Sequence, residues 1–542
     1  MATNIAETFV GAAIKKADHI AVIEAVTGNQ ASFSQLNSWS DGYANYFQKE
    51  GVSAGDVVIL MVTPSIDFIC LTLALFKLGA PVVLIDPGMG YKNLLRCIDR
   101  VNPEVLIGIP KALLFSRLFP KSFKTIKQTF CCGNSFGILG KDVRQLRDTN
   151  VVSHPVYQPS STDLAAIIFT TGSTGPPKGV RYEHSIFSAQ LQLIKNYYGI
   201  CPEDIDQPAF PLFALFSAAI GARTVIPDMN PTKPAKVNPE RFIDSIQKHG
   251  VSYSFGSPAI WNVVSNYCSH RGVVLESVKK VLMAGAPVPS DLMERVVNIL
   301  PPDAKVYTPY GATESLPIVS IEAREVLDDT WEKSRSGKGT CVGRPLPGIE
   351  LKIIRISDDP VTRLTKEIEL PNGEIGEIIV RGEVVTKGYL NNPEEDRMAK
   401  ILDSNSFWHR MGDVGYLDDQ DRLWFCGRRA HRVVTDTDTL YSICCEAIIN
   451  GHDAVYRSAL VGIRKEGGAG ETVPAIIVEP VEGRVINNEK LLKEVRAIAA
   501  KSSVTVQIKH FLIHKDFPVD IRHNAKIFRE KLAVWAQKKI FP

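Results

Sequence analysis

The chain has 542 residues, of which 45% are hydrophobic and 22% are charged, and its formal net charge is +3 at pH 7. These are ordinary values for a globular protein, and they exclude a disordered chain or a fibre. The small net charge, without any block of five like charges, excludes a nucleic-acid-binding arm but leaves small anionic ligands open. Because one hydrophobic core rarely serves so long a chain, we expect two or more domains.

The cysteines and the apolar segments indicate the compartment. None of the ten cysteines forms a C-x-x-C pair, so we expect buried thiols in a reducing cytoplasm instead of a disulfide framework or a zinc site. Charged side chains interrupt the first twenty residues, which predicts no export signal. The longest uncharged apolar stretch, 209–222, is too short to span a bilayer. We expect a buried helix there, one wall of a lipid-binding cavity, or both.

Short apolar segments alternate with helical patterns in the first part of the chain. A strand at 57–62, a helix at 67–78 and a strand at 81–85 form the pattern of a parallel βαβ unit. The same rhythm recurs where the segments 279–283 and 306–307 run into glycine-containing turns. Ligands of open α/β sheets bind at the carboxyl ends of strands, so we expect functional residues in these turns.

The pattern changes after Gly337. Short alternating segments separated by turns predict a small antiparallel β subdomain, with strands at 350–356, 367–370, 377–381 and 422–426. From Ala430 a new α/β pattern runs to the C-terminus. We therefore expect an α/β fold with a large N-terminal domain of parallel-sheet α/β layers plus the β subdomain (1–428). A small mobile α+β C-terminal domain (429–542) follows a hinge at 428–430.

A loop at 169–179 (FTTGSTGPPKG) directly follows the apolar run 164–168. Its threonines and serine supply donors, its glycines let backbone N–H groups approach an anion, and Lys178 adds a positive charge. A polyphosphate-binding loop is the interpretation that fits, with a plain surface loop as the alternative. A Walker A motif is excluded because, counted from Gly172, Pro177 stands where its second glycine belongs and Gly179 where its Ser/Thr belongs.

This loop is one of several motifs that follow one another in a fixed order from about Asp86 to Arg529. The others are Gly285-Ala286-Pro287, Tyr310-Gly311-Ala312-Thr313-Glu314, Gly343-Arg344-Pro345, Gly376-Glu377, Gly388-Tyr389, Gly412-Asp413, Gly427-Arg428 and Lys526. Together they resemble the adenylate-forming superfamily of acyl-CoA synthetases, adenylation domains and luciferases. The resemblance implies ATP and Mg²⁺ as cofactors and a carboxylic acid as substrate.

The resemblance also implies a role for each matching residue. The β- and γ-phosphates of ATP would be held by Thr170, Thr171, Gly172, Ser173, Thr174, Gly175 and Lys178. The adenine would lie between the turn and the tyrosine ring of the second set, Gly285, Ala286, Pro287, Tyr310 and Gly311. Asp413 and Arg428 would bind the ribose. The catalytic residues would be Thr313 at the α-phosphate, Glu314 as the Mg²⁺ ligand, and Lys526 at the α-phosphate and the substrate carboxylate.

The chain departs from the superfamily pattern where coenzyme A would be delivered. Ala430 stands where Asp or Lys is common, and Thr437 replaces a glycine, although a β-branched residue does not readily take a positive φ. Ala214 follows Pro211-Leu212-Phe213 where a histidine or aromatic gate is common, and Ala525 precedes Lys526 where glycine is usual. These departures argue against CoA as a co-substrate and favour an acid that is bulky near its carboxyl end.

With these departures, the segments 407–416 and 517–526 are most similar to the β-lactone synthetases of bacterial long-chain olefin biosynthesis. The resemblance implies that a 2-alkyl-3-hydroxy fatty acid is adenylated and that its own hydroxyl then closes the lactone. His184 and His431 are candidate acceptors of the hydroxyl proton. A long-chain acyl-CoA synthetase and a non-catalytic binding protein remain alternatives. We expect a cytoplasmic protein without a transmembrane anchor, and peripheral membrane association or a complex with other olefin-pathway enzymes stays open.

Overall fold

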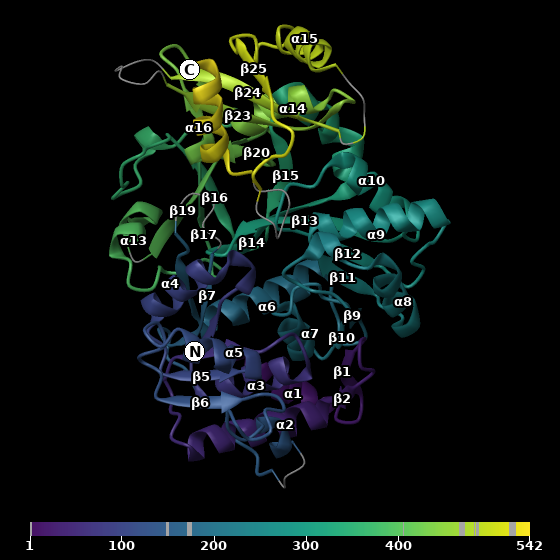
Figure 1. Cartoon of the computed structure of the whole chain (residues 1–542), viewed down its shortest axis with the longest axis vertical. Helices are drawn as coiled ribbons and strands as arrows, with labels where there is room; N and C mark the ends of the chain where they lie inside the picture. The colour runs from purple at the N-terminus through teal and green to yellow at the C-terminus, as the bar shows by residue number, and fades with distance from the viewer. Residues whose placement is uncertain are drawn as a thin grey trace.

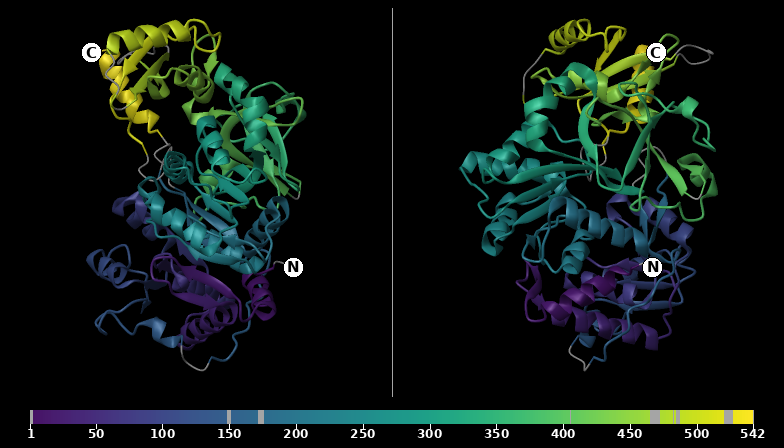
Figure 2. Two further views of the ribbon diagram at one scale, coloured as in Figure 1. Left: turned by 90° about the vertical axis from the view of Figure 1, so that its right-hand side faces the viewer. Right: turned by 180° about the vertical axis from the view of Figure 1, so that it is seen from behind.

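The computed structural model describes residues 3–147, 151–170, 176–404, 406–464, 472–481, 483, 487–519 and 527–541. Its strands form two large sheets, one small sheet and one two-stranded ribbon. The purple N-terminal segment and the yellow C-terminal segment lie at opposite ends of the molecule (Figure 1 and Figure 2). The two large sheets lie in the middle of the molecule and toward its N-terminal end.

The first sheet has six strands in the order β6-β5-β3-β4-β7-β8, parallel except for β8. The βαβ unit expected from the sequence is confirmed, because β3 and β4 pair in parallel on either side of α3 (Ile66–Leu78) in the chain. The strands are β3 (Val58–Met61), β4 (Val82–Leu84), β5 (Val105–Gly108), β6 (Gln128–Cys131), β7 (Leu164–Phe169) and β8 (Gly179–Glu183).

One half of the second sheet is mainly parallel. Its strands follow the order β13-β12-β11-β9-β10-β1, all parallel, with β2 antiparallel at the edge. They are β1 (Ile20–Glu24), β2 (Gln30–Ser32), β9 (Ile205–Asp206), β10 (Arg223–Ile226), β11 (Tyr253–Gly256), β12 (Lys280–Met283) and β13 (Lys305–Ala312). The expected strand at 306–307 is longer than predicted, because β13 continues to Ala312 in antiparallel pairing with β14.

The other half of this sheet is antiparallel and contains the expected β subdomain. Its order is β16-β17-β19-β20-β15-β14, with β18 beside β19. The strands are β14 (Ser315–Glu322), β15 (Thr340–Pro345), β16 (Glu350–Ile354), β17 (Gly376–Arg381), β18 (Lys400–Asp403), β19 (Ser406–Leu417) and β20 (Leu423–Arg428). The prediction of a strand at 367–370 is wrong: Lys366–Ile368 is a short 3₁₀ helix, and Glu369 forms an isolated bridge to Ile354.

The C-terminal segment builds its own small sheet. After β20 the chain forms a 3₁₀ turn, a two-stranded ribbon and then the sheet β23-β24-β25. The strands are β21 (Val433–Val434), β22 (Thr439–Leu440), β23 (Val455–Ile463), β24 (Val473–Pro480) and β25 (His510–Ile513), with helices α14 (Ser442–Asn450), α15 (Asn488–Ala499) and α16 (Arg529–Ile540). This agrees with the expected α+β segment, whereas its mobility stays a prediction.

Helices fill the layer between the two large sheets. α3 contacts β4 of the first sheet and β1 of the second, and α6 likewise contacts β8 and β14. The α-helices that precede α14 in the chain are α1 (Ile5–Lys15), α2 (Phe33–Lys49), α3 (Ile66–Leu78), α4 (Tyr91–Val101), α5 (Pro110–Leu118), α6 (His184–Tyr198), α7 (Phe213–Ile220), α8 (Pro239–His249), α9 (Pro258–Arg271), α10 (Ser290–Asn298), α11 (Ala323–Glu325), α12 (Trp331–Lys333) and α13 (Pro393–Ala399).

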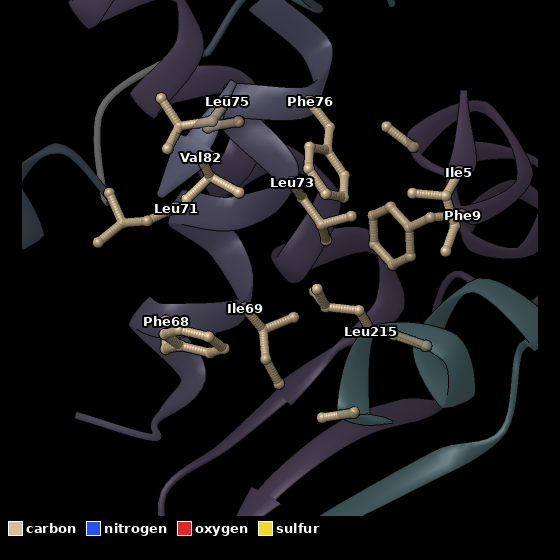
Figure 3. Close-up of a cluster of buried hydrophobic side chains, with 14 of the residues drawn as sticks. Ile5, Phe9, Phe68, Ile69, Leu71, Leu73, Leu75, Phe76, Val82 and Leu215 are labelled. Carbon is tan, nitrogen blue, oxygen red and sulfur yellow. The ribbon is translucent and has the colours of Figure 1, made fainter. Parts of the chain in front are cut away.

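α3 is the centre of the largest hydrophobic core. Every residue of this helix is buried, as expected for a helix that is apolar on all sides. Its side chains meet those of α1 and α7 in one cluster (Figure 3). The two charged residues of α3 are paired: the Lys77 ammonium lies 2.5 Å from Asp41, and Asp67 binds Arg147. The helix ends at Gly79, where φ is +73°.

The expectations about cysteines and membrane spans can be compared with the described residues. All ten cysteines are free thiols, and nine of them are buried. Among the described residues, no helix is long and apolar enough to cross a membrane. The apolar stretch 209–222 forms the buried helix α7 and its approach loop, as predicted.

Candidate active site

A cavity of about 1150 Å³ lies between the sheets and reaches the C-terminal segment. Every described residue that the sequence assigned to ATP, Mg²⁺ or catalysis lines it: Thr170, Lys178, Gly285, Ala286, Pro287, Tyr310, Gly311, Thr313, Glu314, Asp413 and Arg428. Residues 171–175 and Lys526 lie outside the described residues. The structure therefore brings together side chains that are up to 258 positions apart in the sequence, from Thr170 to Arg428.

Tyr310, Asp413 and Arg428 form a connected group in the cavity wall. The Tyr310 hydroxyl donates to the Asp413 carboxylate at 2.5 Å, and the Arg428 guanidinium lies 3.0 Å from the same carboxylate. Pairing of β19 with β20 sets Asp413 directly opposite Arg428. Burial and the Asp413 charge raise the pKa of Tyr310 well above its usual range. The tyrosine therefore stays a neutral donor, and the carboxylate faces the cavity with its position fixed from two sides.

The local strand structure requires glycine at position 311, for a reason that the sequence analysis did not identify. The register of β13 and β14 shifts between Tyr310 and Ala312. A Cβ at Gly311 would lie 2.6 Å from the Ser315 carbonyl oxygen, inside van der Waals contact. Glycine is therefore required by the irregular strand pair itself, beyond the expected close approach of a ligand.

Hydrogen bonds from β8 and from the loop between β17 and α13 hold Thr313 and Glu314. The Tyr182 hydroxyl donates to the Thr313 carbonyl at 2.5 Å, and the Thr386 amide donates to the Glu314 carbonyl at 2.9 Å. The Tyr389 hydroxyl donates to the Glu314 carboxylate at 2.7 Å. Burial and the Glu314 charge raise the pKa of Tyr389, so the phenol remains a donor. The carboxylate is oriented, and it keeps acceptor positions for a further partner.

Lys178 and Thr170 close the base of the predicted phosphate loop. The Thr170 amide donates to the Lys178 carbonyl at 3.0 Å, next to the β7–β8 pair. The Lys178 ammonium lies 2.6 Å from the Glu395 carboxylate of α13. Both side chains are about one third exposed, so solvent screens this ion pair. A phosphate could replace Glu395 as the partner of the ammonium at little cost.

The two histidines suggested as proton acceptors lie in different surroundings. His184 is buried in the core against the rings of Phe76 and Tyr157, which removes it as a candidate. His431 lines the cavity. Burial, with the nearby Arg529 and Arg428 charges, lowers the pKa of His431 to about 3. The imidazole is therefore neutral at pH 7.

The remaining cavity wall is mostly apolar, and its apolar residues come from two groups of elements, which we call the α7 arm and the α5 arm. The α7 arm passes Phe213, whose ring stacks on Phe255 with centroids 3.8 Å apart. The α5 arm passes Leu84 and Ile85 toward the residues of α4 and α5 that line it, namely Leu94, Ala112 and Phe115. The site thus joins a polar end to apolar passages.

Two residues that argued against CoA take positions that the sequence did not specify. Ala214 lines a neighbouring small pocket with Ile69 and Met229, so Phe213 and not Ala214 forms the cavity wall.

Thr437 lies in the turn between β21 and β22, where the Thr435 amide donates to the Asp438 carbonyl at 2.9 Å. Positive φ outside glycine occurs, among the described residues, at Asn102, Phe136, Asn391, Ser404 and Asp421. Thr437 keeps a negative φ, as its β-branched side chain requires.

Comparison with known proteins identifies the family. The profile of the AMP-binding enzyme family matches residues 9–390. The chain belongs to this family. Proteins named olefin beta-lactone synthetase, from Stenotrophomonas maltophilia (strain K279a) and Xanthomonas campestris pv. campestris, are each 42% identical over 94% of this chain and 91% of their own. The amide bond synthetase McbA from Marinactinospora thermotolerans has the same fold, with a TM-score of 0.79, 20% identity and coverage of 98% and 99% of the two chains.

As an AMP-binding enzyme the chain is an adenylate-forming ligase that uses ATP. Short motifs predicted many of the polar residues that line the cavity but did not link them to the partners that hold them. Glu395 and Tyr389 contact Lys178 and Glu314, although nothing in the local sequence links them. Arg410 and Glu377 form a buried ion pair at 2.6 Å in the wall of the cavity. Gly376-Glu377 did stand out as a motif, but its partner on another strand could not be read from spacing.

Proposed function

We propose that this AMP-binding enzyme converts a 2-alkyl-3-hydroxy fatty acid and ATP into a β-lactone, AMP and pyrophosphate. The observation that carries the proposal is one cavity that joins the Tyr310–Asp413–Arg428 group to two apolar arms. An acid with two alkyl branches needs two apolar passages that meet at its carboxyl group. The 42% identity to proteins named olefin beta-lactone synthetase supports the same substrate class.

The nucleotide is proposed to bind at the polar end. Asp413 accepts from the ribose hydroxyls, Arg428 donates nearby, and adenine packs between Tyr310 and the turn at 285–287. Lys178, with the threonines, serine and glycines of 170–175, holds the β- and γ-phosphates. Thr313 donates to the α-phosphate. The support for this arrangement is that all the described members line one cavity.

The Glu314 carboxylate is the proposed ligand of Mg²⁺. Among the described residues no cluster of three or more His, Cys, Asp or Glu side chains could hold a metal ion. Glu314 therefore would hold Mg²⁺ together with phosphate oxygens, a pattern that this hard cation favours. Bound there, the ion would neutralise charge on the departing pyrophosphate. Tyr389 keeps the Glu314 carboxylate oriented toward the cavity.

Adenylation and ring closure balance without a second substrate. A carboxylate oxygen attacks the α-phosphorus and pyrophosphate leaves, and we propose that Lys526 offsets the charge that develops. The β-hydroxyl oxygen then bonds to the activated carbonyl carbon. The bond from that carbon to the AMP oxygen breaks, AMP leaves with the electron pair, and the hydroxyl proton is released. Proximity favours this intramolecular attack, provided that water is excluded from the anhydride.

Residues 429–542 are proposed to act as a mobile domain that closes over the adenylate. The chain crosses from β20 into a 3₁₀ turn at Arg429–His431, and this turn lines the cavity. Rotation there would carry Lys526 toward or away from the α-phosphate. Such closure serves water exclusion.

The compartment and partners are proposed from chemistry alone. Ten free cysteines, nine of them buried, suit a reducing cytoplasm. A waxy product would be handed on most readily within a complex of enzymes that make or consume it. Association with other olefin-pathway enzymes therefore remains part of the proposal.

One assay tests the function. The protein is incubated with ATP, Mg²⁺ and a 2-alkyl-3-hydroxy acid, with and without CoA, and the products are analysed by mass spectrometry. We expect AMP and a product lighter than the acid by one water, both independent of CoA. A CoA thioester as the main product would replace the proposal by an acyl-CoA synthetase. No AMP with any carboxylate would leave a binding protein.

A further inference from the structure

A strongly basic stretch surrounds α5. Between Glu104 and Asp142 the chain has no acidic residue, although its overall net charge is only +3. The same stretch contains six basic residues, namely Lys111, Arg117, Lys121, Lys124, Lys127 and Lys141. Lys127 pairs with Glu104 at 2.6 Å. Four of the other five lie between Pro110 and Lys124, so positive charge is concentrated in and directly after α5.

Large apolar side chains are exposed in the same place. Leu114 is 51% exposed and Leu118 is 74% exposed. They are four residues apart on α5 and share one face of the helix, with Lys111 one turn earlier. In the loop after β6, Phe136 is 88% exposed and Ile138 is 74% exposed. Side chains of this size, left in water beside several cations, mark an interaction surface.

The helix and the loop form one surface. A Cβ at Gly133 would lie 2.8 Å from the Pro110 ring, so the loop starts directly against the beginning of α5. Leu139 of the loop is buried in the same cluster as Leu113 and Phe123. We call the surface that these contacts support the α5 face; it comprises Leu114, Leu118, Lys121, Lys124, Phe136 and Ile138.

The α5 face adjoins one apolar passage of the active site. Ile109, Lys111, Ala112 and Phe115 line the α5 arm of the cavity, and Lys111 is also exposed to solvent. The arm therefore runs to the first turn of the helix whose outer side carries Leu114 and Leu118. The strands β5 and β6, which precede and follow α5 in the chain, lie side by side at the edge of the first sheet (Figure 1).

We propose that the α5 face docks on an anionic lipid surface and that the α5 arm admits the long-chain acid from it. Lysines and arginines attract anionic headgroups, and exposed leucine and phenylalanine side chains enter the headgroup boundary. A protein partner would have to supply acidic residues, whereas an anionic bilayer supplies charge and apolar contact together. The docking step stands on the surface alone, while the admission step rests on the proposed function.

Co-sedimentation with vesicles tests docking without substrate or ATP. The full-length protein is mixed with vesicles of phosphatidylcholine, or of phosphatidylcholine with phosphatidylglycerol. We expect binding to the anionic vesicles only, weakened by salt. Lys121→Glu/Lys124→Glu should lower the partition coefficient at least about tenfold, since each basic residue near such a surface contributes about 1 kcal/mol. Leu114→Ser/Leu118→Ser should lower the partition coefficient by a factor that does not depend on the salt concentration.

Matched controls come from α1, where Ile14 is 76% exposed and Lys15 follows it. Ile14→Ser and Lys15→Glu should leave vesicle binding unchanged, and melting curves of all variants should coincide. Equal binding to both vesicle types, or binding that the α5 variants do not weaken, would overturn the proposal. An absence of vesicle binding would also overturn it. This holds even if the protein self-associates and the α5 variants abolish that self-association.

A second readout tests the admission step. AMP release is measured with a long-chain 3-hydroxy acid carried in anionic vesicles and with a short-chain 3-hydroxy acid dissolved in buffer. Lys121→Glu/Lys124→Glu should slow the first reaction about tenfold and leave the second unchanged. Equal slowing of both would contradict admission through this arm. Loss of lactone formation in the wild type would instead reject the proposed function while docking stands.

Discussion

The two ends of the cavity are built by different kinds of interaction. At the polar end, Tyr310, Asp413 and Arg428 are joined by a hydrogen bond of 2.5 Å and an ion pair of 3.0 Å. In the α7 arm, the main contact is the stacking of Phe213 on Phe255. Directional bonds accept few residue types, whereas apolar packing of similar volume can be made by many. The polar end can thus keep one chemistry while the arms change the acid that is used.

The strongest test of this difference is Lys526→Ala. If Lys526 offsets charge only in the transition state, its loss should slow adenylate formation about a hundredfold to a thousandfold. ATP binding and the preference for acyl chain length should not change. Pyrophosphate exchange measures the rate, and titration calorimetry measures ATP binding. Lys515→Ala, at an exposed position in the same C-terminal segment, is the control. Unchanged exchange would remove Lys526 from the catalytic residues.

Asp413→Ala breaks the polar end without touching the arms. The change removes the acceptor of the Tyr310 hydroxyl and the counter-charge of Arg428. We expect KM for ATP to rise about tenfold to a hundredfold, as for the loss of hydrogen bonds to a charged group. Chain-length preference should stay as in the wild type. Asp419→Ala, at an exposed position after β19, should behave as wild type. A shift in chain preference would mean that the two ends are coupled.

We expect Lys400 to make the polar end sensitive to pH. Burial lowers its pKa to about 7, although the Glu314 and Asp396 carboxylates partly oppose this shift. Above pH 7 the amine is largely neutral, and below pH 7 its charge competes with Mg²⁺ for Glu314. We expect the Mg²⁺ concentration for half-maximal activity to rise about threefold to tenfold as the pH falls from 8 to 6.

Protonation of Lys400 at lower pH should also decrease the free energy of unfolding. A lysine whose pKa is lower in the folded protein than in the unfolded chain destabilises the fold as the pH falls through the folded value. Lys400→Met should therefore flatten the pH dependence both of the Mg²⁺ requirement and of the free energy of unfolding. Lys387→Met is the control, because the Lys387 ammonium donates to the Ser161 carbonyl on the surface. A Mg²⁺ requirement that stays pH-dependent in Lys400→Met would exclude this role.

The difference between the polar end and the apolar arms also explains which features could be predicted from the sequence. Glu314 and Asp413 stand in short motifs because each needs one residue type at one place, Glu314 in the turn between β13 and β14 and Asp413 on β19. Their partners Tyr389 and Arg428 lie in the loop between β17 and α13 and on β20, and each stood out only because it belongs to a motif of its own. Glu395 belongs to a surface helix whose local pattern contains no sign of the ion pair with Lys178.

The apolar parts of the fold were predictable at a coarser level. The pattern of 57–85 predicted β3, α3 and β4, because a helix buried on all sides leaves a continuous apolar sequence. The longer course of β13 was not predictable, because it depends on pairing with β14 across an irregular register. Ala214 suggested an opened acyl site, but the direction of Phe213 depends on stacking with Phe255, which is distant in sequence. Packing partners of this kind leave no local signal.

Phe213→Ala tests the apolar side of the comparison and should have the smallest effect. Removing the ring that stacks on Phe255 widens the α7 arm by a cavity that the neighbours fill only in part. We expect kcat/KM to change by about threefold to tenfold, in favour of acids with a longer or bulkier branch, because one or two methylene groups contribute about 1–3 kcal/mol in such a pocket. KM for ATP should stay constant. The measurement is kcat/KM over a series of 3-hydroxy acids, with Tyr456→Ala, 54% exposed and outside the cavity lining, as the aromatic control. If KM for ATP rose and chain preference did not move, the arm would be part of the nucleotide site, and the division of the cavity into a fixed polar end and adjustable apolar arms would fail.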